Sequence, residues 1–218
     1  MGHQPLSNSP GFDADFRQHF RDLLVWRRDV RRFRTDKLPD GLLERLLDLA
    51  CLAPSVGLSQ PWRFVRVDDP VRRESVRAEF EHCNAEALAA QSLERAGLYA
   101  SLKLAGLREA PCHLAVFVDP DPAQGAGLGR RTMPETLAYS AVAAIQTLWL
   151  AARAEGIGLG WVSILRPAVM NGLLDVPADW RLVGYLCIGY PAEPDDVPEL
   201  ERAHWEHRRP LSEVLLER

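Results

Sequence analysis

Lysine is almost absent from this 218-residue sequence: two of its 26 basic residues are lysine, and the rest are arginine. Because this bias extends along the whole chain, arginine content by itself indicates no function. Acidic residues outnumber basic ones and give a formal net charge of −4, so no overall positive field attracts nucleic acid or an anionic membrane. The uncharged run at residues 136–152 is too short to cross a bilayer. We expect a soluble, cytoplasmic protein that binds neither nucleic acid nor membrane.

Motifs for metal binding and for common nucleophiles are missing as well. The four cysteines lie far apart, without the C-x-x-C or C-x-x-H spacing of a structural zinc site. His204 and His207 have helical spacing but no convincing third ligand nearby, so we expect surface histidines and no metal site. The sequence contains no G-x-S-x-G, H-E-x-x-H or P-loop motif, which removes the usual basis for a hydrolase or a nucleotide kinase.

The length of the chain and its hydrophobic content of 47% are sufficient for one globular domain with its own core. Residues 1–15 contain no apolar leader and are expected to form a disordered tail, whereas residues 16–218 are expected to form the single domain. Hydrophobic periodicity and turn residues predict an α+β fold with few strands. The expected helices lie within residues 16–26, 39–53, 70–110 and 134–155, and the expected strands within 63–67, 114–118, 156–163 and 182–188.

The expected helix at residues 134–155 is apolar around nearly its whole circumference, and a capping box at Thr132–Glu135 precedes it. A helix of this composition is expected to be buried from every side. A single subunit of this size could hardly cover it alone, so packing suggests a homodimer whose interface contains this helix.

The segment from Arg27 to Arg34 concentrates positive charge around one carboxylate. If it were helical, Arg27, Arg31 and Arg34 would share one face and could bind a phosphate through forked, charge-assisted hydrogen bonds. The alternative is a solvated basic stripe paired with neighbouring acids, and this segment alone favours that alternative. Asp29, surrounded by arginines, is expected to stay ionised.

Three glycine-containing loops could meet a ligand. Residues 53–64 combine two prolines, a glycine and two serines, which suits the polar edge of a planar ligand as well as an ordinary helix-to-strand connection. Residues 156–163 could place Trp161 and Ser163 beside a ring, or could simply cap a helix and enter a core strand. The loop at 125–131 lacks the strand–turn–helix context of a Rossmann fingerprint; it is a flexible lid or, more simply, a surface loop.

Taken together and in order, four segments resemble the FMN-dependent nitroreductase superfamily between about Trp26 and Arg209. These are the R-R-x-x-R-x-F opening, the A-P-S-x-G-x-x-Q-P-W loop, the buried helix followed by G-I-G-x-x-W, and the late basic pair. Asp29 and Leu58 stand where the superfamily usually has Ser and Asn. Here the strings APSVGLSQPWRF, GRRTMPETLAYS and GWVSIL resemble a branch of the superfamily that consumes reduced FMN and O2.

This resemblance implies a nitroreductase-like three-layer sandwich, with a mixed central sheet and a long buried helix. It also implies an intertwined homodimer, in which the C-terminal arm of each chain wraps its partner and two FMN sites lie at the interface. By position, the FMN-binding residues would be Arg27, Arg28, Asp29, Val30, Arg31, Pro54, Ser55, Gly160, Trp161, Ser163 and Arg208. Asp29 and Ser163 would be catalytic.

The activity implied by the same resemblance is the O2-dependent fragmentation of reduced FMN to 5,6-dimethylbenzimidazole and erythrose 4-phosphate, for the lower ligand of cobalamin. A flavin reductase would then be the expected source of reduced FMN. An NAD(P)H-dependent nitroreductase that leaves FMN intact is the first alternative, and a flavin-binding protein without catalysis is the second. Asp29 and the absence of Asn at position 58 argue against the first alternative.

Overall fold

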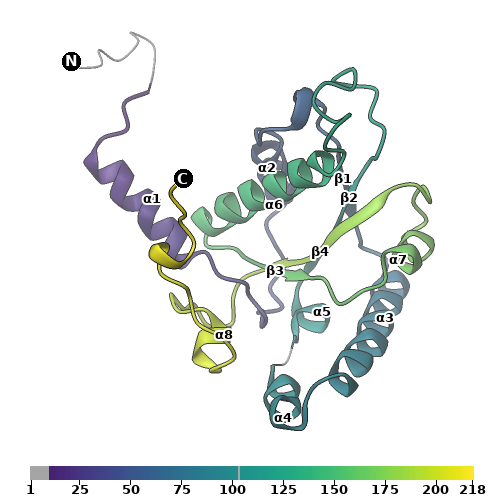
Figure 1. Ribbon diagram of the computed structural model, residues 1–218. Helices are drawn as coiled ribbons and strands as arrows, with labels where there is room; N and C mark the ends of the chain where they lie inside the picture. The colour runs from purple at the N-terminus through teal and green to yellow at the C-terminus, as the bar shows by residue number, and fades with distance from the viewer. Residues whose placement is uncertain (1–9, 103) are drawn as a thin grey trace.

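The computed structural model describes residues 10–102 and 104–218, and most of the expected N-terminal tail, residues 1–9, lies outside these (Figure 1). Helix α1 begins at Ala14, capped by the Asp13 side chain, so the tail ends slightly earlier than expected. The helices are α1 Ala14–Trp26, α2 Leu42–Ala50, α3 Pro70–Ala89, α4 Leu93–Ser101, α5 Gly106–Glu109, α6 Thr136–Ala154, α7 Pro167–Leu174 and α8 Glu199–Arg202. The strands are β1 Trp62–Arg66, β2 Cys112–Val118, β3 Gly158–Val162 and β4 Arg181–Gly189, and two 3-10 turns lie at Val56–Leu58 and Leu211–Glu213.

The four strands form one sheet in the order β1-β2-β4-β3, and every neighbouring pair is antiparallel. The expectation of a mixed sheet is therefore corrected for the part of the chain that the structure describes. Helix α6 carries the chain from β2 to β3, which run in the same direction, but β4 lies between them and runs the opposite way. The parallel pairing among the described residues is a single bridge between Asp29 and Leu159.

Helices cover both faces of this sheet, which confirms the three-layer sandwich (Figure 1). Alternation along β2 separates the two cores, because successive side chains of a strand point to opposite faces. Leu114 and Val116 pack with α2 and α6 on one face. Ala115 and Phe117 pack with α3, α5 and α7 on the other. The sheet and its two helical layers thus form a rigid frame for the segments around it.

Helix α6 is less completely covered than its composition predicted. Ala144 and Leu148 are fully buried, but Tyr139 is 59% exposed and Val142 is 41% exposed in the single chain. The expected capping box is wrong: Glu135 is the N-cap, and its side chain makes no capping hydrogen bond. An apolar stripe of α6 therefore remains open on one side.

The region at residues 70–110 is divided into α3, α4 and α5 rather than forming one helical stretch. The start of α3 is as predicted, with Pro70 at its first turn and the Asp69 carboxylate accepting a hydrogen bond from the Val71 N–H. Within the described residues, no helix is both long and apolar enough to cross a membrane.

The arginine-rich segment is extended, so the common face that a helix would give Arg27, Arg31 and Arg34 does not form. The chain leaves α1 at Arg27 and passes along the free edge of β3, where the Val30 N–H donates to the Leu159 carbonyl at 3.0 Å. Farther on, the Arg34 N–H donates to the Tyr190 carbonyl at 2.9 Å. Hydrogen bonding to a sheet edge outweighed helix propensity, and it holds this segment next to the sheet.

Candidate functional site

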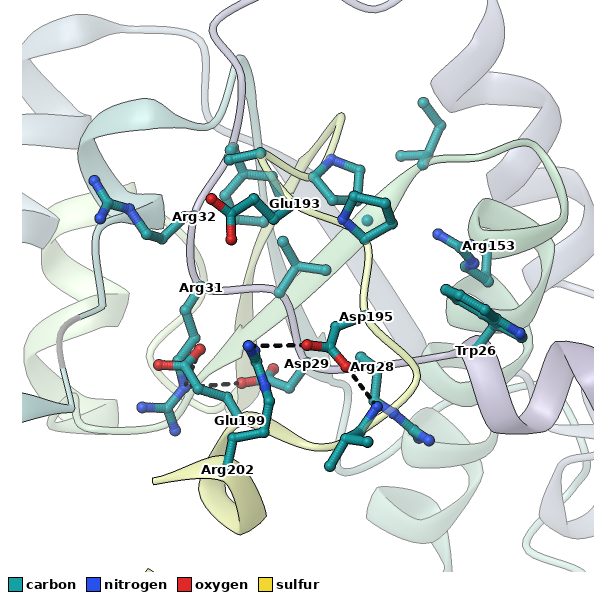
Figure 2. Close-up of a pocket in the computed structure, with 18 of the residues that line it drawn as sticks. Trp26, Arg28, Asp29, Arg31, Arg32, Arg153, Glu193, Asp195, Glu199 and Arg202 are labelled. Atoms are coloured by element: carbon teal, nitrogen blue, oxygen red, sulfur yellow. Dashed lines mark hydrogen bonds and ion pairs between the residues drawn. The ribbon is translucent and has the colours of Figure 1, made fainter. Parts of the chain in front are cut away.

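A cavity of about 690 Å³ lies between the extended segment at residues 28–33, the C-terminal end of α6 and the chain after β4 (Figure 2). Of the predicted ligand-binding residues, Arg28, Asp29, Val30 and Arg31 line it. The far wall is formed by residues 191–203, which belong to the C-terminal region. The cavity therefore brings together two parts of the chain that are far apart in sequence.

Three guanidinium groups gather beside this cavity, on Arg27, Arg28 and Arg208. Burial and the nearby charge of Arg208 lower the pKa of Arg27, although Asp29 acts in the opposite direction. Burial, Arg208 and Arg27 likewise lower the pKa of Arg28. Within the described part of the chain, none of the three forms an ion pair with a carboxylate. Mutually repelling cations without carboxylate partners suit a bound dianion such as a phosphate.

Segments of the C-terminal region already contact two of the predicted arginines. The Arg28 side chain donates from Nε and Nη2 to the Asp196 carbonyl oxygen. Arg31 lies between two carboxylates, with its Nε 3.7 Å from Asp29 Oδ2 and 3.8 Å from Glu199 Oε2, and its side chain is 16% exposed. Arg31 is thus less free to bind a phosphate than Arg27 or Arg28.

Asp29 is anchored at the edge of β3. Its Oδ1 accepts a hydrogen bond from the Trp161 N–H at 2.9 Å, while Oδ2 faces Arg31 (Figure 2). Desolvation by burial raises the pKa of Asp29 and outweighs the Trp161 hydrogen bond and Arg31, which lower it. The arginines favour the ionised form of Asp29, as expected, but burial opposes them. A carboxylate with a raised pKa is better suited to taking up a proton near neutral pH.

The glycines of β3 allow the arginine segment to lie this close. A Cβ at Gly160 would collide with the Val30 carbonyl oxygen, and one at Gly158 would lie 2.7 Å from Val30 Cγ2. Val30 therefore packs on the strand while it lines the cavity. Trp161 lies over Gly184, and Ser163 is exposed just beyond the last residue of β3.

Pro54 and Ser55 lie away from the arginines, at the other end of α6. The Val56 N–H donates to Ser140 Oγ in the first turns of that helix, whereas the arginines lie beside Trp149. Nine residues of helix separate Ser140 from Trp149, which corresponds to roughly 13 Å along the axis. The Ser55 hydroxyl accepts a hydrogen bond from the Gln60 N–H at 3.1 Å. One chain therefore does not assemble all the predicted ligand-binding residues around one cavity.

Comparison with known proteins agrees with this arrangement of elements. The sequence profile of the nitroreductase family matches residues 24–190. The chain belongs to the nitroreductase family. It is 57% identical over 205 residues to the 5,6-dimethylbenzimidazole synthase of Rhodospirillum rubrum, covering 94% of this chain and 97% of that protein. It is 49% identical over 199 residues to a protein of the same name from Rhodobacter capsulatus, covering 91% of this chain and 96% of that protein.

A solved structure has a similar fold. Oxidised iodotyrosine deiodinase, bound to FMN and 3-iodo-L-tyrosine, superposes with a TM-score of 0.68 at 27% identity. The match covers 80% of this chain and 91% of the deiodinase. The superfamily resemblance that the motifs indicated is confirmed, and the chain is an oxidoreductase with a nitroreductase fold.

Two features of this nitroreductase-family chain were missed by sequence reasoning. The loop at residues 124–131 lies at the surface, as the simpler expectation held, but it also packs against the loop that contains Gly57. A Cβ at Gly125 would lie 2.7 Å from the Gly57 carbonyl oxygen, and the Gln124 side chain donates to the Leu58 carbonyl at 2.7 Å. The second feature is Trp149, which contacts the arginine segment; its only signal is a bulky aromatic in a helix rich in alanine and leucine.

Proposed function

We propose that this chain catalyses the O2-dependent fragmentation of reduced FMN to 5,6-dimethylbenzimidazole and erythrose 4-phosphate, which supplies the lower ligand of cobalamin. The observation that carries the proposal is its 57% identity to the Rhodospirillum rubrum 5,6-dimethylbenzimidazole synthase over 94% of this chain. The proposal includes a cytoplasmic location and a flavin reductase as the source of reduced FMN.

The charge distribution of the site fits FMN. After burial, the nearby charge of Arg208 is the next cause that lowers the pKa of Arg27 and of Arg28, and a phosphate would relieve this repulsion. When bound, reduced FMN supplies the electrons that O2 accepts and the carbon atoms of both products. The arginines would hold the phosphate end of the molecule.

We propose that a second copy of the chain completes each site. Pro54 and Ser55 lie at the opposite end of α6 from the arginines. The FMN-binding residues implied by the family resemblance can therefore meet in one site only if two subunits contribute to it. Exposed apolar surface supports this arrangement. Helix α1 has no buried residue, although it carries Phe16 and Phe20, and α6 leaves Tyr139 exposed. Surfaces of this kind are typical of chains that associate.

Asp29 and Ser163 are the proposed catalytic residues. Asp29 would accept a hydroxyl proton from the ribityl chain when a carbon–carbon bond of that chain breaks. Its raised pKa supports this role, and its hydrogen bond from Trp161 fixes the orientation of the carboxylate. Ser163, whose side chain is exposed beyond β3, would orient O2 through a hydrogen bond from its hydroxyl.

The proposal is tested by incubating the protein with chemically reduced FMN in air and separating flavin from products by chromatography. We expect loss of flavin and formation of 5,6-dimethylbenzimidazole. An NAD(P)H-dependent nitroreductase or a non-catalytic flavin-binding protein would leave all the flavin intact, and that result would refute the proposal.

The Asp29→Asn variant tests the proposed base within the same assay. It should retain FMN affinity, because the amide keeps the shape of the side chain and the arginines keep the phosphate. Product formation should fall by roughly two to four orders of magnitude, since an amide cannot take up the proton. Weak FMN binding combined with normal turnover of the bound flavin would instead assign Asp29 a structural role.

A further inference from the structure

Trp149 makes two separate contacts with the arginine segment. Its indole Nε1–H donates a hydrogen bond to the Arg28 carbonyl oxygen at 3.1 Å. The guanidinium carbon of Arg27 lies over the indole ring, 4.8 Å from its centroid. One side chain therefore fixes the backbone of one arginine and supports the charged group of its neighbour.

These contacts matter because the arginine segment has little structure of its own. Arg27 ends α1 in an extended conformation, and the next backbone bond to the sheet is made only at Val30. Arginine side chains have many rotamers, and ordering them on binding reduces affinity. A support that orders Arg27 and Arg28 before the ligand arrives removes part of this cost.

Trp149 itself is held firmly. It is 8% exposed and belongs to the core between α6 and the sheet. The centroid of its ring lies 6.2 Å from that of the Trp161 ring. The backbone N–H of Trp161 donates the hydrogen bond to Asp29. The packing of α6 on the sheet is thus connected through Trp149 to the position of the arginines.

We infer that Trp149 is a positioning residue for phosphate recognition, which sets how much tighter the protein binds FMN than riboflavin. This inference rests on the proposed FMN site and assigns no contact between Trp149 and the reacting atoms. It predicts that loss of Trp149 weakens binding of the phosphorylated flavin selectively. A purely structural tryptophan would, when removed, weaken the binding of both flavins alike.

The experiment measures dissociation constants of oxidised FMN and of riboflavin for the wild type, Trp149→Phe and Trp149→Leu. The Phe variant keeps an aromatic face and loses the N–H, whereas the Leu variant loses both. A cation–π contact and one hydrogen bond of ordinary strength predict about a 3–10-fold loss of FMN affinity for Phe and about 10–100-fold for Leu. Riboflavin affinity should change by less than about twofold.

Trp180→Phe is a matched control, because Trp180 also lies beneath an arginine, with the Arg63 guanidinium carbon 5.9 Å from its ring centroid, but packs in the core on the other face of the sheet. It should leave both affinities unchanged. In an Arg27→Ala background, the effect of Trp149→Leu on FMN should shrink, since one of its two contacts is already lost.

The outcomes separate this inference from the proposed site. If the wild type binds FMN and riboflavin equally, the proposed phosphate site is wrong. If the wild type prefers FMN but Trp149→Phe and Trp149→Leu weaken both flavins to the same extent, the site stands and the positioning role is overturned. The Phe variant conserves volume and aromaticity, so it keeps the test available if Trp149→Leu does not fold.

Discussion

Gly160 shows how a single residue determines the geometry of the site. The arginine segment crosses β3 so closely that a Cβ at this position would meet the Val30 carbonyl oxygen. The atom that would have to move is backbone, which cannot rotate away as a flexible side chain could. The G-x-G pattern at residues 158–160 could be interpreted as a ligand contact. In the structure, these glycines are needed so that Val30 can pack directly on β3.

Gly160→Ala should destabilise the protein by about 1–3 kcal/mol and also weaken FMN binding, because relief of the collision displaces Val30 and the arginines before it. The control is Gly172→Ala in α7, where an added Cβ meets no atom within 4 Å. That variant should be neutral or slightly stabilising, since alanine favours helix. Denaturant unfolding and FMN titration measure both effects; equal stability of the two variants would contradict the close crossing.

His113 provides a prediction for pH. It is 1% exposed on β2, with its Nδ1 2.8 Å from the Tyr185 hydroxyl, and burial lowers the pKa of His113 to about 4. The folded protein therefore keeps the ring neutral, whereas the unfolded chain takes up a proton below about pH 6.5. This contribution to stability is fully present above pH 6.5 and is lost as pH falls to 4.

Between pH 7 and pH 4 this single group should lower the free energy of unfolding by roughly 3 kcal/mol. His113→Gln should remove that part of the pH dependence, while His82→Gln, at a side chain that is 52% exposed, should leave it unchanged. Urea unfolding at a series of pH values measures the difference. Parallel pH profiles for the wild type and His113→Gln would show that His113 does not titrate as its burial requires.

At the scale of elements, patterns that depend on neighbouring residues were predicted well. Alternating hydrophobicity located β1 and a short apolar run located β2, each within a residue or two, and Asp69-Pro70 located the first turn of α3. The errors concern interactions between distant segments. The sequence does not reveal that the arginine segment bonds to the open edge of β3, and the capping hydrogen bond expected before α6 does not form.

The same limit applies to the candidate site. Arg28, Asp29, Val30 and Arg31 were predicted together and lie together, because they are adjacent in sequence. The proximity of Arg208 to Arg27 and Arg28 came from the family resemblance rather than from spacing. The contact of the 124–131 loop with Gly57 depends on two loops separated by more than sixty residues, and no local pattern indicates it.

An ion pair between a buried carboxylate and a half-exposed guanidinium connects α3 to the turn that carries Ser163. The Glu79 side chain is 5% exposed and accepts hydrogen bonds from Arg166 Nε at 2.6 Å and Nη2 at 2.7 Å, which lowers the pKa of Glu79 to about 2. Its stabilising effect is therefore present above about pH 4.5 and is lost as pH falls towards 2.

Glu79→Gln should lower the free energy of unfolding by about 1–3 kcal/mol, since the buried side chain at position 79 loses its charge-assisted hydrogen bonds from Arg166. Glu74→Gln is the matched control on the same helix, because Glu74 pairs with Arg77 with a side chain that is 62% exposed. It should have a much smaller effect, because this ion pair is exposed to solvent. Thermal and denaturant unfolding measure the free energy of unfolding of both variants. Equal decreases would show that the Glu79–Arg166 pair stabilises the fold no more than the exposed Glu74–Arg77 pair.

At the scale of the whole molecule, the division of the ligand-binding residues predicts a dimer with shared sites. A chain carrying Arg27→Ala and a chain carrying Ser55→Leu should each be inactive alone. Mixed dimers restore one intact site, so random mixing should recover about a quarter of wild-type product. Light scattering at micromolar concentration should give the mass of two chains. A monomer mass, or no recovery on mixing, would place each site within one chain.

Fragmentation of FMN is tested most directly by a single turnover. The protein is loaded without oxygen with one equivalent of reduced FMN per chain, O2 is admitted, and oxidised flavin is followed by its visible absorbance while 5,6-dimethylbenzimidazole is quantified. We expect the absorbance of the bound fraction not to return, and one molecule of 5,6-dimethylbenzimidazole to form for each FMN lost. Full return of the oxidised flavin spectrum, without 5,6-dimethylbenzimidazole, would contradict the proposed function.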